Sequence, residues 1–170
     1  PEIISLSPTC LEDVWNDILE LGIALEKEII AKKIVKSIKN DISIISKKNK
    51  NKDPISVGCI EWIEPIMFAG NWVPEIVQIA GGKSSFGVAG EHSNWSKYEE
   101  LYQCDPDKII FMPCGYDMNK TKVELSNLTH NVRWKSLKAV KTDEVYLTDG
   151  NQYFNRPGPR DRKSTRLNSS

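Results

Sequence analysis

The chain has 170 residues, with 23 basic and 23 acidic side chains and 39% hydrophobic residues. This composition is typical of a globular domain with an apolar core and excludes a disordered tail. No apolar run approaches the roughly 18 to 20 residues of a membrane span, and the amino-terminal residues lack the pattern of a signal peptide. The balanced charge gives no reason to expect nucleic acid as a partner.

The amino-terminal residues predict a strand followed by a helix. Residues 3–6 contain a short apolar run that favours a buried strand. After a break at Pro8, Thr9 and Glu12 have the spacing of a capping box, which satisfies free backbone donors at a helix start. Apolar residues then recur at helical spacing over residues 11–22, so we expect a helix there.

A long amphipathic helix is predicted over residues 23–53. This stretch contains neither glycine nor proline, and isoleucine recurs along it every three or four residues. About 22 helical residues would extend roughly 33 Å, the length of a whole domain. The lysine-rich end favours a solvated helix terminus, and a basic binding patch is the alternative.

After residue 54 the pattern changes to alternating strands and helices. This alternation predicts an open α/β sheet, whose ligands bind at the carboxyl ends of the strands. We expect the helix at residues 96–103 to begin with a capping box formed by Ser96 and Glu99. The predicted strands are 55–60, 108–112 and 145–147, and the predicted helices are 73–80, 96–103, 120–128 and 134–140.

The four cysteines are far apart, and no pair has the C-x-x-C spacing of structural zinc. Their placement favours small buried side chains and no disulfide framework. A catalytic pair of a cysteine with His92 or His130 is the alternative, although neither histidine lies in a nucleophile motif. Phosphate-binding loop, dinucleotide-binding and hydrolase motifs are absent. The cysteines are Cys10, Cys59, Cys104 and Cys114.

Three predicted loops carry aromatic side chains next to strand ends. Residues 61–75 include Trp62 and Trp72, a second loop contains Trp95, and residues 149–160 form the third. Aromatic faces offer contact area at low entropic cost, so this pattern favours a site for a large, flat, mostly apolar ligand. The alternative is that Trp62 and Trp72 fill the core and seal the loops onto the sheet.

The third loop also contains Arg156 and Arg160, with Pro157, Gly158 and Pro159 between them. A guanidinium on a stiffened segment offers a fixed fork of donors to a polar group of a ligand. The alternative is an arginine that pairs with a carboxylate at the surface.

These segments resemble the cobalamin branch of the substrate-binding proteins of ABC importers, in the class that also binds siderophores and haem. The resemblance extends from residue 1 to residue 160. It lies in PEIISLSPTCLEDV at the start, in EW-x-x-P-x-x-x-AG-x-W-x-PE, in CDPDKIIFMPCG and in DGNQYFNRPGPR.

The resemblance implies the class III periplasmic-binding-protein fold, with two α/β lobes joined by a long helix, of which mainly the carboxy-terminal lobe is present. Residues 1–22 are then a remnant of the first lobe, 23–53 the interlobe helix and 54–160 the second lobe. The final segment, 161–170, reads DRKSTRLNSS and resembles the translation of a sequencing adapter, so we exclude it from fold reasoning.

The resemblance also implies a function. A non-enzymatic, monomeric protein would bind a corrinoid (vitamin B12) between its lobes, without a catalytic cofactor, and deliver it to an ABC permease. Glu99 and Glu100 are the implied permease-docking residues, with the capping role as the alternative for Glu99. His92 is a candidate cobalt ligand. The implied corrinoid contacts are Trp95, Trp62, Trp72, Phe154 and Arg156.

Two other functions stay open. A haem or siderophore binder of the same fold would hold an equally flat or apolar ligand. An intracellular enzyme or binding protein on the same two-lobe scaffold could use Cys114 or His92. The resemblance implies a periplasmic or other extracytoplasmic location. The four cysteines show no disulfide framework, so a cytoplasmic location is the alternative.

Overall fold

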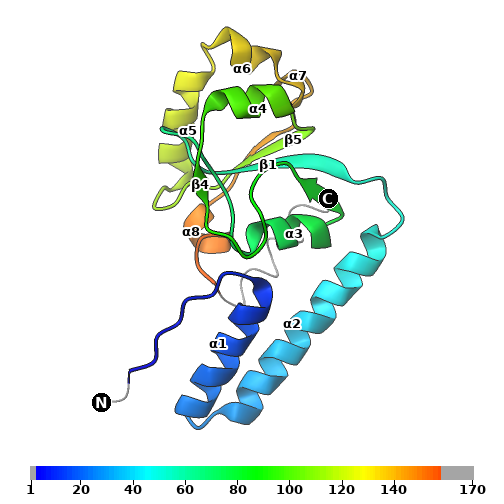
Figure 1. Ribbon diagram of the computed structural model, residues 1–170, viewed down its shortest axis with the longest axis vertical. Helices are drawn as coiled ribbons and strands as arrows, with labels where there is room; N and C mark the ends of the chain where they lie inside the picture. The colour runs from blue at the N-terminus through cyan, green and yellow to red at the C-terminus, as the bar shows by residue number, and fades with distance from the viewer. Residues whose placement is uncertain (1–2, 158–170) are drawn as a thin grey trace.

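The computed structural model describes residues 3–157. A helical hairpin lies beneath an α/β lobe (Figure 1). The hairpin consists of α1 (Leu11–Ala24) and α2 (Glu28–Asn49), which pack against each other. Within residues 3–157, no helix combines the length and apolar character needed to cross a membrane.

The predicted long helix is confirmed, but it begins at Glu28 and not at residue 23. A tight turn intervenes, in which Glu26 adopts a left-handed φ of 55°. The pattern missed this turn because it contains neither glycine nor proline. The two helices meet closely at Gly22, where an added Cβ would lie 2.3 Å from the Cβ of Ala31.

The predicted amino-terminal strand is wrong. Residues 3–9 form no strand, and Ile3 is 88% exposed, because no described strand lies beside them to pair with. The capping residue also differs from the prediction. Asp13, and not Glu12, accepts hydrogen bonds from the backbone N–H and hydroxyl of Thr9, both at 2.9 Å. Glu12 pairs instead with Lys39 across the hairpin at 3.0 Å.

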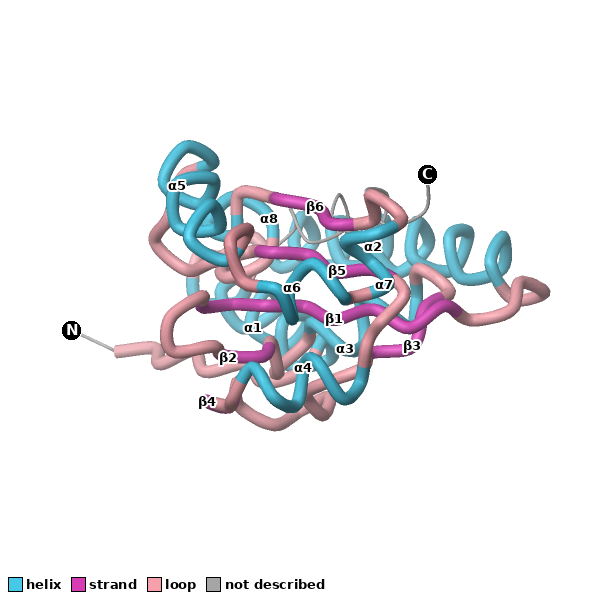
Figure 2. Tube along the Cα trace, turned by 90° about the horizontal axis from the view of Figure 1, so that it is seen from above, coloured by secondary structure: helices cyan, strands magenta, loops and turns pink. Residues whose placement is uncertain are grey.

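Six strands of the described chain form one mixed sheet (Figure 2). Four of them, β3, β1, β5 and β6, run parallel, and β2 and β4 extend the β1 edge in antiparallel pairs. The three predicted strands are confirmed, and the other three, of two or three residues each, were not predicted. The strands are β1 (Ile55–Trp62), β2 (Met67–Phe68), β3 (Gly82–Ser84), β4 (Asn94–Trp95), β5 (Lys108–Phe111) and β6 (Val145–Leu147).

Helices cover both faces of the sheet, and strand alternation divides the core in two. Cys59 and Ile110 face α1, α2 and α3, whereas Ile60 and Ile109 face the helices that follow β4 and β5. The four predicted helices are confirmed with shifted ends, and the last is split in two. The helices of the lobe are α3 (Val73–Ile79), α4 (Tyr98–Cys104), α5 (Met118–Leu128), α6 (Val132–Ser136), α7 (Lys138–Lys141) and α8 (Gly150–Tyr153).

The predicted capping box of α4 is wrong. The helix begins at Tyr98, with Lys97 as the N-cap residue, so Ser96 lies too early to cap it. The Ser96 hydroxyl is buried without a hydrogen-bond partner among the described residues. Glu99 pairs with Arg133 of α6, with 3.0 Å between Oε1 and Nη1.

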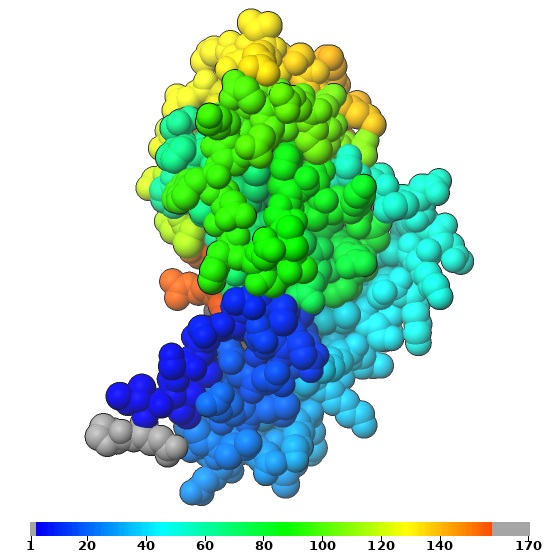
Figure 3. Space-filling model, viewed as in Figure 1, coloured from blue at the N-terminus to red at the C-terminus, as the bar shows by residue number. Residues whose placement is uncertain are grey.

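The hairpin is docked onto the lobe and shares its core. The backbone N–H of Leu11, at the start of α1, donates a 2.7 Å hydrogen bond to the carboxylate of Glu75 on α3. Trp15 of α1 and Ile38 of α2 belong to the same buried cluster as Phe154. The space-filling view shows the first residues of α1 directly against the lobe (Figure 3).

Candidate functional site at the strand ends

Two of the predicted tryptophans lie in one row across three strands. Trp62 at the end of β1 is paired with Met67 of β2, and Met67 is paired with Trp95 of β4. Directly opposed residues in antiparallel pairs lie side by side, and the β1–β2 register shifts between Ile60 and Trp62 to bring Trp62 opposite Met67. With about 4.8 Å between adjacent strands, the two tryptophan Cα atoms are roughly 10 Å apart. Trp62 and Met67 are half-buried, and Trp95 is 61% exposed.

Tyr116 lengthens this row beyond β1. Its ring packs against that of Trp62 at an angle of 59°, with 5.0 Å between the centroids. The Lys120 ammonium lies 3.8 Å from the centre of the Tyr116 ring. Tyr116 was not among the predicted contacts, although its place just after a predicted strand was the available signal. The aromatic ledge is therefore made of Tyr116, Trp62, Met67 and Trp95.

The loop that carries Trp95, residues 86–95, is bonded to the backbone after β2. The N–H of Asn71 donates to the carbonyl of Glu91 at 2.6 Å, and the N–H of Gly90 donates to the carbonyl of Asn71 at 3.1 Å. A Cβ at position 70 would lie 2.4 Å from the Glu91 carbonyl oxygen. Only glycine allows this close approach.

The loop after β5 is braced by α8. The N–H of Gly115 donates to the side-chain oxygen of Asn151 at 2.9 Å. The side-chain amide of Asn155 donates to the carbonyl of Met112 at 3.0 Å. Residues 149–160 were predicted to form a loop, but they include the short helix α8, which supports the segment that carries Tyr116.

Two predicted contacts lie in the core. Trp72 and Phe154 are 7% and 2% exposed, and the indole Nε1 of Trp72 donates to the Phe154 carbonyl at 3.0 Å. Trp72 therefore fills the core, which was the alternative to a ligand contact, and Phe154 belongs to the same buried cluster. Burial removes both rings from the exposed part of the strand ends.

The remaining predicted residues are at the surface. Arg156 is exposed after α8, and His92 is exposed in the Trp95 loop. Glu99 and Glu100 are exposed in the first turn of α4. Arg160 and residues 161–170 lie outside the described part of the chain.

The cysteines depart from the expectation of buried side chains. Cys59 is buried, and burial raises the pKa of its thiol to about 12. Cys104 and Cys114 are exposed. Among residues 3–157, no group of three or more histidines, cysteines or acidic residues is arranged to hold a metal ion.

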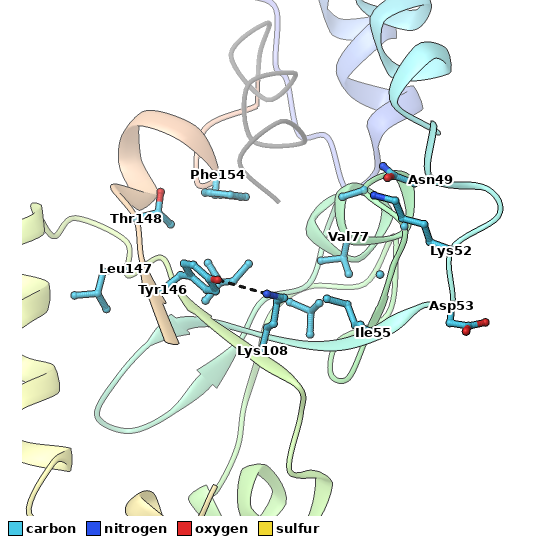
Figure 4. Close-up of a pocket in the computed structure, with 15 residues that line it drawn as sticks. Asn49, Lys52, Asp53, Ile55, Val77, Lys108, Tyr146, Leu147, Thr148 and Phe154 are labelled. Carbon is cyan, nitrogen blue, oxygen red and sulfur yellow. Dashed lines mark hydrogen bonds between the residues drawn. The ribbon is translucent and has the colours of Figure 1, made fainter. Parts of the chain in front are cut away.

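A separate cavity of about 370 Å³ lies over the α3 face of the sheet (Figure 4). Its lining includes the first residues of β1 and β5, Ile55 and Lys108, together with Val77 and Phe154. The Lys108 ammonium lies 3.4 Å from the Tyr146 hydroxyl at its edge. The exposed residues of the ledge do not line this cavity, so it is distinct from the strand-end site.

This architecture is that of class III periplasmic binding proteins over part of their length. A substrate-binding protein of an ABC transporter from Listeria monocytogenes superposes with a TM-score of 0.87 at 20% identity, covering 99% of this chain and 66% of that one. IsdE of Staphylococcus aureus complexed with heme gives 0.85 at 21% identity, covering 98% and 66%. The periplasmic vitamin B12 binding protein BtuF of Vibrio cholerae gives 0.71 at 17% identity, covering 98% and 63%.

A sequence relative is the high-affinity heme uptake system protein IsdE of Staphylococcus aureus, 25% identical over 140 residues. The match covers 80% of this chain and 48% of the relative, so the chain spans about half the length of the curated relatives it matches. No protein-family model matches the chain.

The comparisons support the predicted fold. The proteins described above are named for substrate binding and heme uptake, which agrees with the prediction of a non-enzymatic protein. Support for the cobalamin branch in particular is weaker, because the sequence relative is a heme uptake protein.

Proposed function

We propose that this chain provides one wall of a binding site for a metal tetrapyrrole in a substrate-binding protein of an ABC importer. Haem is the first candidate ligand and a corrinoid the second. The aromatic ledge carries this proposal, since it presents aromatic and thioether surface at the carboxyl ends of the strands. Flat ligands gain contact area and stacking on such a surface.

The choice of haem rests on the sequence relative. A heme uptake protein aligns with 80% of the chain at 25% identity, whereas the vitamin B12 binding protein is similar in fold at 17% identity. Cobalamin is kept as the second candidate because of the motifs that the chain shares with that branch. Within this proposal Trp62 and Trp95 contact the macrocycle, and Arg156 is available to its acidic substituents.

A direct titration tests the proposal. The full chain is titrated separately with haemin, cyanocobalamin and ferrichrome, a hydroxamate siderophore, while tryptophan fluorescence and the visible spectrum are recorded. One wall covers one face of a flat ligand, so we expect saturable quenching by haemin at roughly micromolar concentration. Saturation by cyanocobalamin alone would select the corrinoid reading. A folded chain that responds to none of the three compounds would overturn the proposal.

The partner and location follow the same proposal. Glu99 and Glu100 are exposed on α4 and could face arginines of a permease, although Arg133 already neutralises part of the charge at Glu99. We propose an extracytoplasmic location on the same grounds. Charge reversal at Glu100 in the full-length protein should reduce ligand transfer to its permease without changing ligand affinity, and unchanged transfer would remove Glu100 from this role.

A further inference from the structure

We infer that Glu61 is a positioning residue that joins the two sides of the aromatic ledge and holds Trp95 in place for the ligand. This inference deepens the proposed function and rests on it for the ligand, but the structural part can be tested without one. Glu61 is next to Trp62 at the end of β1, and its side chain is half-buried.

A single hydroxyl links Glu61 to the Trp95 loop. Ser93 donates its hydroxyl hydrogen to the Glu61 carboxylate. The Ser93 hydroxyl oxygen also accepts a hydrogen bond from the N–H of Gly70 at 3.0 Å. The hydroxyl therefore uses its donor and an acceptor position together, which fixes its orientation. Because Ser93 is two residues before Trp95, this bridge ties the start of β4 to the end of β1.

The main chain of Glu61 supports the other side of the ledge. Its carbonyl accepts the N–H of Cys114 at 3.1 Å, in the loop that carries Tyr116. One residue thus contacts the segments before Trp95 and before Tyr116. Displacement of Glu61 would affect both ends of the ledge, whereas the core beneath would keep its apolar contacts.

The location of a carboxylate here has an energetic cost. Burial raises the pKa of Glu61, and the hydrogen bond from Ser93 opposes that shift. Burying a charged group is unfavourable unless hydrogen bonds compensate it, so an apolar residue would be cheaper if only packing mattered. The hydrogen bond from Ser93 offsets part of this desolvation cost and is specific to a carboxylate or another acceptor at this position.

The Trp95 loop also has little room to settle elsewhere. Its backbone lies against Gly70 so closely that a Cβ there would approach the Glu91 carbonyl to 2.4 Å. If the Ser93 bridge is lost, the loop has no second position in which it packs equally well. We therefore expect the contact at Gly70 to loosen. The neighbouring amides of Gly70, Asn71 and Gly90 should report that loosening.

Amide hydrogen exchange on the ligand-free full chain tests the structural part. Glu61→Ala and Ser93→Ala should each raise the exchange rates of these three amides by about tenfold, since hydrogen bonds to charged groups are worth that much or more. The double variant should add little to either single change. Glu61→Gln keeps an acceptor for Ser93 and should restore most of the protection. Ser136→Ala, which removes an exposed hydroxyl bonded to the Arg133 carbonyl at 2.7 Å, is the matched control.

Haemin titration of the same variants tests the link to function. Affinity should fall several-fold in Glu61→Ala and recover in Glu61→Gln, while the Ile109 amide on β5 exchanges at its original rate. If the wild-type chain binds none of the titrated ligands but the exchange pattern holds, the proposed function fails and the positioning role survives. Unchanged exchange in both alanine variants overturns the inference, whatever the ligand result.

Discussion

The indole Nε1 of Trp72 donates a 3.0 Å hydrogen bond to the carbonyl of Phe154, 82 positions further along the chain. Both side chains are buried, so this bond connects the start of α3 to the end of α8 inside the core. The sequence allowed Trp72 either a ligand-binding or a packing role, and its burial shows that it packs in the core.

Trp72→Phe should therefore destabilise the protein. The change keeps an aromatic ring but leaves the buried Phe154 carbonyl without its donor, which costs about 1–3 kcal/mol. Urea unfolding would measure the loss in the free energy of unfolding. Trp95→Phe is the matched control and should stay within about 0.5 kcal/mol of wild type, because Trp95 is exposed. Equal effects of the two changes would contradict the core assignment.

Trp95→Ala should weaken haemin binding about tenfold while leaving the free energy of unfolding nearly unchanged, since stacking on an exposed ring is lost. Fluorescence titration of the remaining tryptophans would measure the affinity. Tyr146→Ala is the comparison, because Tyr146 is an exposed aromatic residue at the edge of the separate cavity. A larger loss from Tyr146→Ala would move the ligand from the ledge to that cavity.

His92→Ala tests whether the exposed imidazole of the Trp95 loop ligates the bound metal. Imidazole nitrogen is a common ligand of haem iron, so its removal should shift the Soret band of the haemin complex. Affinity should fall as well, while exchange of the Asn71 amide stays constant. His130→Ala, at an exposed position after α5, should leave the spectrum as it is. Identical spectra for wild type and His92→Ala would exclude His92 as an axial ligand.

Gly22→Ala should destabilise the hairpin. The added methyl group would lie 2.3 Å from the Cβ of Ala31, and such overpacking costs about 1–3 kcal/mol. Thermal or urea unfolding would detect the loss. Ala31→Gly in the same chain removes the clash and should restore part of the stability, less about 1 kcal/mol for a glycine inside a helix. A double variant no more stable than Gly22→Ala would argue against this contact.

The start of α1 should weaken in acid. Hydrogen bonds from Thr9, with its backbone N–H the largest cause, lower the pKa of Asp13 from 3.8 to about 2. A carboxylate whose pKa is lowered in the folded state stabilises the fold at pH values above its pKa in the unfolded state. This contribution is lost as the pH falls from 3.8 towards 2. The stability difference between wild type and Asp13→Asn should therefore shrink over that interval, as measured by urea unfolding. Thr9→Val should raise the Asp13 pKa in an NMR titration, and an unchanged pKa would contradict the assignment.

Much of the fold could be predicted because its longer elements carry strong local patterns. The buried runs at β1 and β5 and the isoleucine periodicity of α2 each identify their element. The turn at Glu26 and the strands β2 and β4 were missed. A turn without glycine or proline has no local signal, and a strand of two residues has no period.

The site was harder to predict because it depends on pairing between distant segments. The sequence predicted Trp62 and Trp95 in two separate loops, but only the register through Met67 brings them into one row. The same limitation applies to Trp72, whose burial depends on Phe154. Local sequence can nominate aromatic residues, whereas tertiary pairing decides which of them reach solvent.

The bond from Leu11 to Glu75 also determines where this structure can bend. Because α1 is fastened to α3 by that bond and by shared core residues, the hairpin and the sheet should rotate together as one rigid lever. Residues 3–9 have no regular structure, so we expect any bending next to the docked hairpin to occur in this segment.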